Sequence, residues 1–367
     1  MLVFPQPWVK LVAVIIVAFL ISLGSTPIVK AFATKVGAMD VPRDARRVHD
    51  HPIPRMGGLS IFMGFLLSVL LFVDITNEIR GILLGLVLIV ATGVLDDIVS
   101  LNAWVKLGAQ VLAAVIAVLH GVAIHFFMHP NVFVQGNVLN IGWLAYPITV
   151  LWIVGITNSV NLIDGLDGLA VGVSTISCIT ILVAVLLTGG VDPSVPLLIA
   201  ALAGACIGFM PYNLNPAQIF MGDTGSLMLG FTLSTVSVLG LFKFYTIVTF
   251  VVPVLALAVP LSDTVFAFCR RILHGQSPFK ADRGHFHHKL MDLGFNQKQS
   301  VAILYAISAI LGLAAVTLTT NGVLRFLLLL LALAIAIAVW AFLSRAIKAQ
   351  MHEQQTTEGE EHEREQD

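Results

Sequence analysis

Long apolar runs separated by short polar segments recur along the chain as far as about residue 343. Runs of this length can cross about 30 Å of hydrocarbon as α-helices. The pattern therefore predicts an all-α polytopic membrane protein with about eleven transmembrane helices. They lie near residues 8–29, 57–73, 79–95, 103–119, 143–158, 169–187, 195–212, 225–242, 246–268, 302–319 and 323–343.

Composition agrees with this pattern and excludes a soluble globular domain. The chain is 57% hydrophobic and only 11% charged, and its mean hydropathy is +0.94. The first apolar run has no charged segment before it and no clear small-residue cleavage site after it. We therefore expect a retained anchor rather than a removed signal peptide.

Lysine and arginine are distributed unevenly between the two sets of alternate loops. Because cytoplasmic loops of membrane proteins are enriched in these residues, the richer set predicts a cytoplasmic tail and an external N-terminus. Fifteen of the twenty basic residues belong to that set. They are Lys30, Lys35, Arg43, Arg46, Arg47, Arg55, Arg270, Arg271, Lys280, Arg283, Lys289, Lys298, Arg345, Lys348 and Arg364.

The C-terminal segment differs in composition from the rest of the chain. After Gln350 it is rich in acids and has almost no apolar side chains to bury. This composition favours disorder. The sequence thus predicts an integral membrane domain over 1–349 and a disordered acidic cytoplasmic tail over 350–367, to which we assign no catalytic role.

Several carboxylates lie at or near ends of apolar runs that the predicted topology places at the cytoplasmic face. Ionisable groups at membrane depth are costly and usually mark function. Asp96 and Asp97 close one such run, and a carboxylate pair there suits a divalent cation or a cationic partner. A helix end that is simply solvated by two acids is the alternative.

A ladder of polar residues follows another apolar run. Asn158, Asn161, Asp164 and Asp167 recur every third position until glycines interrupt the helix. A helix-to-turn transition of this kind can direct several oxygens inward. Amide and carboxylate oxygens are hard ligands that suit Mg²⁺, which completes its shell with waters and substrate phosphates.

The segment Phe220-Met-Gly-Asp-Thr-Gly-Ser opens a further span. Its glycines, on either side of Asp223, let the backbone come close to a ligand. A glycine-rich turn at a helix N-terminus also offers free N–H groups to an anion. Asp223, a metal and a phosphate form a coherent arrangement, and a plain helix cap is the alternative.

The long basic loop ends in Arg283-Gly-His-Phe-His-His. Its guanidinium and the imidazoles of His285, His287 and His288 could hold pyrophosphate oxygens or sugar hydroxyls. A solvated histidine-rich loop is the alternative. Zinc is not favoured because no cysteine lies nearby.

Three other charged residues admit two interpretations each. Lys106 is either a phosphate contact that a turn brings back to the carboxylates of Asp96 and Asp97 or a snorkelling lysine. Arg55, in His51-Pro-Ile-Pro-Arg-Met-Gly-Gly, either meets a lipid phosphate or is an interfacial arginine in a rigid entry turn. Asp263 either meets substrate or pairs with the nearby arginines, and we favour the structural pairing.

Five segments together follow the order and spacing of a known enzyme family. They are Pro-Arg-Met-Gly-Gly at 54–58, Asp96-Asp97, the ladder at 158–168, Phe-Met-Gly-Asp-Thr-Gly-Ser at 220–226 and His-Phe-His-His at 285–288. On these segments the chain, from about residue 30 to 300, resembles the polyprenyl-phosphate N-acetylhexosamine-1-phosphate transferases. It looks most like the bacterial undecaprenyl-phosphate GlcNAc-1-phosphate transferases, which begin teichoic-acid, O-antigen or common-antigen assembly.

This resemblance implies a Mg²⁺-dependent reaction, with Mn²⁺ as an alternative ion, in the bacterial plasma membrane. A lipid phosphate oxygen would attack the β-phosphorus of UDP-GlcNAc to give undecaprenyl-diphospho-GlcNAc and UMP. The related phospho-MurNAc-pentapeptide transferases of peptidoglycan synthesis are the alternative. They carry Thr where Arg55 stands and a differently arranged histidine cluster, and both differences favour the GlcNAc enzyme.

The resemblance also assigns roles, carried over motif by motif. Asp223 and Asn161 would be metal ligands, and Lys106 would meet the pyrophosphate. Asp96 and Asp97 would lie by the lipid phosphate, with no general base assigned. The donor would be bound by Asn158, Asp164, Asp167, Arg283, His285, His287 and His288, and Arg55 is a further substrate-binding candidate.

An ion-coupled transporter is the rival from a different functional class, since intramembrane carboxylates also mark ion pathways. Its site should lie near the bilayer midplane and show paired repeats. Here the acids gather at one face, and the two halves show no matching polar-interrupted segments. The expected partners are UDP-GlcNAc, undecaprenyl phosphate and membrane lipid, with no nucleic acid, and homodimerisation is left open.

Overall fold

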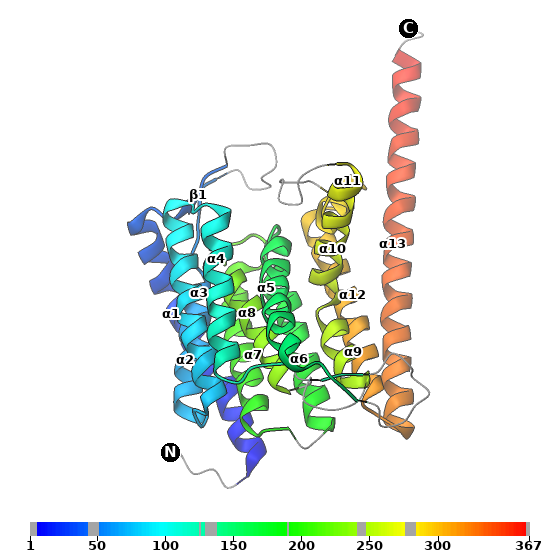
Figure 1. The fold of residues 1–367 in the computed structure, drawn as a ribbon. Coiled ribbons are helices and arrows are strands. Elements are labelled where there is room, and N and C mark those ends of the chain that lie inside the picture. Colours follow the sequence, from blue (N-terminus) through cyan, green and yellow to red (C-terminus); the bar gives the residue numbers. More distant parts are fainter. Residues whose placement is uncertain are drawn as a thin grey trace.

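The protein forms a bundle of long helices (Figure 1). The computed structural model describes residues 6–42, 51–124, 126–128, 138–188, 191–240, 247–275 and 284–364. The helices are α1 (Pro7–Val36), α2 (Gly58–Phe72), α3 (Asn77–Val99), α4 (Ala103–Leu119), α5 (Ala145–Ile163), α6 (Leu169–Thr188), α7 (Ser194–Asn213), α8 (Gly222–Gly240), α9 (Ile247–Ala256), α10 (Ala258–Leu273), α11 (Phe286–Asp292), α12 (Gln297–Leu318) and α13 (Gly322–Arg364).

Seven of the helical segments in the described chain are long and apolar enough to cross a membrane, and α2 and α4 are shorter apolar helices. The fold is therefore that of a mainly helical multi-pass membrane protein, and the predicted number of eleven spans stays a prediction. The seven segments are Pro7–Val36, Asn77–Val99, Gly142–Ile163, Leu169–Thr188, Ser194–Asn213, Gln297–Leu318 and Gly322–Phe342.

The centre of the bundle is α8, which is not among the seven. Every residue of α8 from Thr224 to Gly240 is buried, and α2, α3, α5, α6 and α7 pack around it. Many of these residues are serine, threonine or glycine, and the hydroxyls bond back to the helix, as Thr232 does to the Met228 carbonyl. Small residues let helices approach closely. A helix enclosed by protein does not need lipid-like hydropathy.

The apolar run at 246–268 is not one helix. It divides at Leu257 into α9 and α10. Pro260 explains the break, because proline lacks an N–H and its ring crowds the carbonyl four residues earlier. The run predicted as one apolar segment therefore consists of two consecutive helices.

The two termini lie at opposite ends of the bundle (Figure 1). The C-terminal end also carries β1 and α11. At the edge of the bundle, α13 packs against α12, and no residue of its apolar stretch Gly322–Phe342 is buried. The helix continues to Arg364, where the sequence predicted disorder from residue 350. Glutamate, glutamine and lysine are good helix formers, and extending an existing helix needs no nucleation. The domain boundary at 349 stays a prediction.

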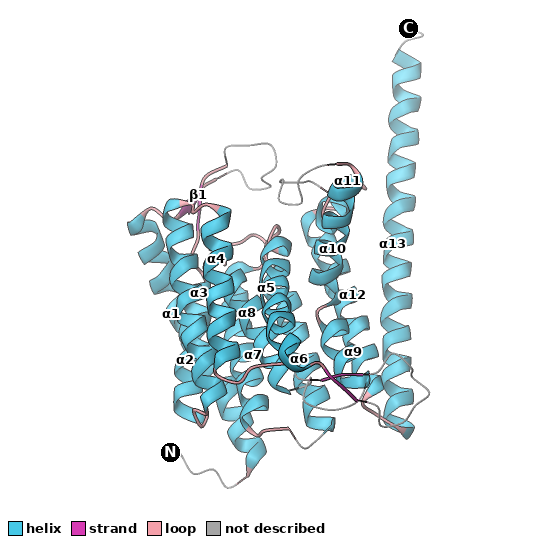
Figure 2. Cartoon of the chain, viewed as in Figure 1, coloured by secondary structure: helices cyan, strands magenta, loops and turns pink. Residues whose placement is uncertain are grey.

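Two short strand pairs modify the all-α prediction (Figure 2). β1 (Met39–Asp40) pairs antiparallel with β2 (Ile53–Pro54), with Asp40 opposite Ile53. β3 (Phe126–Met128) and β4 (Val138–Asn140) form a second pair between α4 and α5. The strands are only two or three residues long, which is too short for a pattern of alternating hydrophobic residues to predict them. The first pair matters for function because it leads into Arg55.

Candidate active site

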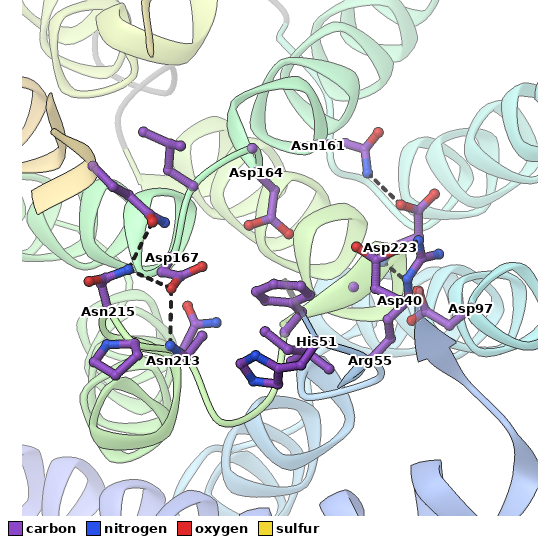
Figure 3. Close-up of a pocket in the computed structure, with 18 residues that line it drawn as sticks. Asp40, His51, Arg55, Asp97, Asn161, Asp164, Asp167, Asn213, Asn215 and Asp223 are labelled. Atoms are coloured by element: carbon purple, nitrogen blue, oxygen red, sulfur yellow. Dashed lines mark hydrogen bonds and ion pairs between the residues drawn. The ribbon is translucent and has the colours of Figure 1, made fainter. Parts of the chain in front are cut away.

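A polar cavity of about 420 Å³ opens where several helix ends meet (Figure 3). Its walls come from the β1–β2 pair, the ends of α3, α5 and α7, the start of α8 and the start of α12. Lining residues are Asp40, His51, Ile53, Arg55, Asp97, Asn161, Asp164, Gly165, Leu166, Asp167, Asn213, Asn215, Pro216, Ala217, Phe220, Gly222, Asp223 and Gln297.

Asp97 connects α3 to the first turn of α8. Its Oδ1 accepts the Asp223 backbone N–H at 3.0 Å. Its Oδ2 accepts the Thr224 N–H at 3.1 Å and the Thr224 hydroxyl at 2.6 Å. The first N–H groups of a helix lack intrahelical partners, and a carboxylate there both caps them and interacts favourably with the helix dipole. Asp97 therefore holds Asp223 in place.

The start of α8 depends on glycine. Gly222 has φ +71°, and a Cβ there would lie 2.4 Å from Asp97 Oδ2. Gly225 and Gly58 bring α8 and α2 into backbone contact, since a Cβ on Gly58 would come within 2.0 Å of Gly225 Cα. The glycines predicted for close approach to a ligand thus serve first to pack helix against helix.

Lys106 joins two carboxylates. Its Nζ lies 2.6 Å from Asp223 Oδ2 and 3.2 Å from Asp96 Oδ2. The chain reverses between α3 and α4 because Ser100 adopts φ +52° and the Leu101 N–H donates to Asp96 Oδ1 at 2.7 Å. The turn that would return Lys106 to the carboxylates at the end of α3 is present. Lys106 contacts Asp96 of that pair, and its second partner is Asp223.

Asn161 faces the same aspartate from α5. Its Nδ2 donates to Asp223 Oδ1 at 3.1 Å and to Ser226 Oγ at 2.8 Å. Ser226 in turn donates to the Gly222 carbonyl at 3.0 Å, so its oxygen accepts from Asn161. These partners orient the Asn161 amide and leave its Oδ1 as an acceptor.

Two further members of the ladder lie in the turn after α5. Figure 3 shows Asp164 between the Asn161–Asp223 pair and the Asp167–Asn215 pair. Asp167 Oδ2 accepts from Asn215 Nδ2 at 2.9 Å and from the Ala217 N–H at 3.0 Å. Burial, followed by the charges of Asp223, Asp97 and Asp167, raises the pKa of Asp164 to about 8. The cavity is crowded with carboxyl groups that a cation would stabilise.

The fourth member of the ladder is outside the cavity lining. Asn158 pairs its side-chain amide with Gln110 of α4, and its Nδ2 also donates to the Val154 carbonyl at 2.9 Å. This amide pair joins α4 to α5 one helical turn away from Asn161. The geometry gives Asn158 a packing function, and its predicted contact with the donor stays a prediction.

Arg55 lies at the cavity wall beside Asp40. Its Nη2 is 2.6 Å from Asp40 Oδ1, and 27% of the Arg55 side chain and 12% of the Asp40 side chain are exposed. Figure 3 places the pair near Asp223 and Asp97. Arg55 therefore belongs to the polar cavity rather than to an isolated entry turn.

The histidine cluster flanks the cavity on α11. Asp263 of α10 accepts from the Phe286 N–H at 2.7 Å and lies 2.7 Å from His285 Nδ1. Asp263 therefore pairs with His285 and with the N-terminus of α11, whereas the sequence predicted arginines as its partners. Arg283 lies outside the described residues, so its predicted role is not placed.

His287 lies against the turn that follows α5. A Cβ on Gly165 would lie 2.5 Å from His287 Nε2, which puts the ring against the turn that carries Asp164. The ring stacks on His285 at 5.9 Å between centroids and tilts against His288 at 4.3 Å. Burial, followed by the charge of His288, lowers the pKa of His287 to about 4. His287 is therefore neutral at pH 7 and packs α11 against the cavity wall.

An apolar groove of about 980 Å³ runs between α4 and α5. It includes Leu107, the residue after Lys106, so it starts beside the polar cluster at Asp223. The groove is lined by Leu107, Val111, Val115, Val118, Leu119, Gly121, Ala123, Tyr146, Pro147, Val150, Leu151 and Val154.

Comparison with known proteins identifies the family. The pattern of glycosyl transferase family 4 matches residues 79–241. The chain is 46% identical over 310 residues to a probable undecaprenyl-phosphate N-acetylglucosaminyl 1-phosphate transferase of Bacillus subtilis, an alignment that covers 83% of this chain and 85% of the relative. The chain belongs to the polyprenyl-phosphate N-acetylhexosamine-1-phosphate transferases.

Two further transferases show how the similarity is distributed between branches of the family. A decaprenyl-phosphate N-acetylglucosaminephosphotransferase of Mycolicibacterium smegmatis is 33% identical over 337 residues, with 84% of this chain and 82% of the relative covered. A phospho-N-acetylmuramoyl-pentapeptide-transferase of Heliobacterium modesticaldum is 37% identical over only 196 residues, 51% of this chain and 60% of the relative. The more complete similarity is to the GlcNAc branch.

The family resemblance implies Mg²⁺, and the oxygens around Asp223 fit this ion. No three His, Cys, Asp or Glu side chains in the described segments form a metal cage. Mg²⁺ usually binds through one or two carboxylates and completes its shell with waters and phosphates. The two carboxylate oxygens of Asp223 accept hydrogen bonds from Lys106 and Asn161 and keep further lone pairs for a metal ion. Asn161 also offers its amide oxygen. The donor set therefore suits Mg²⁺ in this transferase.

Sequence reasoning missed part of the transferase cavity. Asp40, Asn213, Asn215 and Gln297 line it and were not predicted as site residues. Asn213 and Asn215 did leave a signal, because they stand in a polar, proline-broken turn just before Phe220. Gln297 left none, since it is the first residue of an otherwise ordinary helix.

Proposed function

We propose that this protein transfers GlcNAc-1-phosphate from UDP-GlcNAc to undecaprenyl phosphate, forming undecaprenyl-diphospho-GlcNAc and UMP. This would be the first membrane step in assembly of a cell-wall or surface polysaccharide. Similarity to GlcNAc-type transferases over more than four fifths of the chain supports the proposal.

One structural observation carries the proposal. Lys106 lies between the polar cavity and the apolar α4–α5 groove: its ammonium touches Asp223, which lines the cavity, and its neighbour Leu107 lines the groove. A polyprenyl phosphate needs hydrocarbon for its chain and a polar site for its phosphate. A nucleotide sugar needs the polar site alone. The junction at Lys106 offers both environments side by side.

In this account, each side of the junction holds one substrate. The polyprenyl chain occupies the α4–α5 groove, with its phosphate near Lys106 and Asp96. The UDP-sugar occupies the polar cavity, where Asp164 and Asp167 shape the nucleotide site. The histidines at and near the start of α11 engage the sugar and its phosphates from the flank, and Arg283 binds the donor as well.

Asp223 and Asn161 would hold Mg²⁺, or Mn²⁺ in its place. When bound, the ion would neutralise phosphate charge, which is the main requirement of phosphoryl transfer. Asp97 would position Asp223 by capping α8, and Asp96 would position Lys106. These pairs orient the site before substrate enters.

The chemical step needs little proton transfer. An ionised oxygen of the lipid phosphate attacks the β-phosphorus of UDP-GlcNAc, and the bond from that phosphorus to the bridging oxygen breaks. UMP leaves with the electron pair on its phosphate. Because the nucleophile is already ionised at pH 7, we assign no general base to Asp96 or Asp97.

We further propose an external N-terminus and a cytoplasmic active site in the bacterial plasma membrane. The excess of basic residues in one set of loops supports this orientation. The opposite positions of the termini agree with an odd number of spans (Figure 1). A cytoplasmic cavity would meet UDP-sugars where they are made.

Donor competition tests the proposed function. Purified protein in detergent with undecaprenyl phosphate and Mg²⁺ should move label from the β-phosphate of UDP-GlcNAc into the lipid phase. UDP-MurNAc-pentapeptide should give no labelled lipid. Lipid formation only from the pentapeptide donor would reassign the protein to the peptidoglycan branch and reject the GlcNAc proposal.

A further inference from the structure

Among the described residues lining the cavity, Arg55 is the only arginine or lysine, whereas five are aspartates. A diphosphate that enters such a cavity meets strong repulsion unless cationic donors are held ready. Arg55 is therefore the protein's own counter-charge on this wall. The aspartates are Asp40, Asp97, Asp164, Asp167 and Asp223.

The backbone around Arg55 is fixed on both sides. The Arg55 N–H donates to the Ala38 carbonyl at 2.9 Å, which extends the β1–β2 pair by one bond. The Phe220 N–H donates to the Pro54 carbonyl at 2.8 Å, and the Gly57 N–H donates to the Phe220 carbonyl at 2.9 Å. Arg55 is thus tied to the segment that leads into Asp223.

The next residue has an unusual conformation. Met56 has φ +75° and is fully buried. A residue with a Cβ is uncommon in this left-handed region, and such strain persists only where the surrounding structure enforces it. The turn places the Met56 side chain in the core while Arg55 lines the cavity.

We infer that Asp40 is a positioning residue that holds the Arg55 guanidinium at the cavity wall to bind the diphosphate of the nucleotide-sugar donor. The inference rests on the proposed function and refines its donor site. Asp40 occupies one Nη2 hydrogen bond of Arg55, and the arginine fork has five N–H donors in all. The remaining donors suit phosphate oxygens, which arginine binds through paired hydrogen bonds.

The position of Arg55 favours the donor over the lipid phosphate. Arg55 shares the cavity with Asp164 and Asp167, and its charge acts on Asp164. The α4–α5 groove, in contrast, begins beside Lys106 and has no lining residue from β2. The inference therefore gives Arg55 the donor as its ligand, whereas one of the two sequence interpretations gave it a lipid phosphate.

Without Asp40, the Arg55 guanidinium loses the ion pair that fixes it at the cavity wall. The freed side chain would adopt other rotamers, and ordering it again on binding would weaken its contact with the donor. Asp40→Asn should therefore raise the KM for UDP-GlcNAc by roughly tenfold or more, the range expected for one charge-assisted contact. The KM for undecaprenyl phosphate should change by less than about twofold, because the lipid site does not include Arg55.

The experiment compares both KM values in wild type, Asp40→Asn, Arg55→Gln and the double variant. The double variant should be no worse than Arg55→Gln alone, because residues that act through one another are not additive. Asp40→Glu should restore part of the donor affinity. Val41→Ala is the matched control, since this half-exposed neighbour lies on the same hairpin and outside the cavity lining.

Melting curves and calorimetric binding of UDP-GlcNAc without lipid acceptor accompany the kinetics. If Asp40→Asn does not fold, Arg55→Gln and Asp40→Glu still give the donor and lipid KM values. An unchanged KM for UDP-GlcNAc in folded Asp40→Asn, or a rise confined to undecaprenyl phosphate, overturns the inference. Failure of wild type to turn over UDP-GlcNAc would instead reject the proposed function.

Discussion

Lys106 Nζ lies 2.6 Å from Asp223 Oδ2, although the two residues are 117 positions apart. The same ammonium is 3.2 Å from Asp96. One cation thus connects α3, α4 and α8 beside the apolar α4–α5 groove. In the proposed reaction this ammonium orients the Asp223 carboxylate and binds a substrate phosphate.

Lys106→Gln should reduce kcat by about 100-fold or more, because two partly buried carboxylates lose their cation and a phosphate loses a charged donor. UMP release at saturating substrates measures this effect. Arg80→Gln serves as a control, since this exposed arginine lies at the opposite end of α3. Near wild-type turnover by Lys106→Gln would contradict the phosphate role.

Asp223→Asn should abolish turnover by weakening Mg²⁺ binding. The substitution keeps the shape of the side chain but removes the charge that attracts both the ion and Lys106. Rates are measured over a Mg²⁺ titration in wild type and variant. Wild-type rates for the variant at low Mg²⁺ would refute the metal assignment.

Acid should destabilise the docking of α11 through His287. Its folded pKa of about 4 lies below the usual value of 6.5, so the unfolded chain binds more protons between these values. The stabilising effect is complete above pH 6.5 and is lost as pH falls towards 4, by at most about 3 kcal/mol. The groups that act on His287 are Asp263, His285 and His288.

Melting temperatures at pH 7.5 and pH 5 test this dependence in wild type and His287→Gln. The amide does not titrate, so the variant should lose less stability on acidification. Equal losses in the two proteins would show that His287 does not contribute to the acid sensitivity.

Removal of residues 351–367 should leave kcat and both KM values within about twofold of wild type. The segment extends α13 beyond the apolar stretch that ends at Phe342, and α13 packs at the edge of the bundle. The kinetics of the truncated protein are compared with full-length protein in the same detergent. A large fall in activity at unchanged stability would reveal a function for the tail.

The sequence was most informative where a motif is local. Asn161, Asp164 and Asp167 were predicted to share a site, and all three line the cavity. Asn158 was predicted to share the same site but does not line the cavity. It lies further inside α5, which continues to Ile163, and its side chain contacts Gln110 on the neighbouring α4. Periodicity identifies a helix face, but the end of the helix determines which residues reach the cavity.

The parts that could not be predicted depend on distant segments. Asp40 becomes a site residue only because β1 pairs with β2, and Gln297 only because α12 packs beside the turn at Asn215. The Lys106 contact with Asp223 likewise requires α3, α4 and α8 to meet. Hydropathy located these helices, whereas their lateral packing depends on small residues such as Gly58 and Gly225.

The most direct test is UMP release by purified protein that has both UDP-GlcNAc and undecaprenyl phosphate, with each substrate omitted in turn and EDTA added last. The account predicts UMP only when both substrates are present, and its loss on chelation. No UMP from the complete mixture, from protein shown to be folded, would contradict the proposed transfer. Equal release after chelation would contradict the role of Mg²⁺ alone.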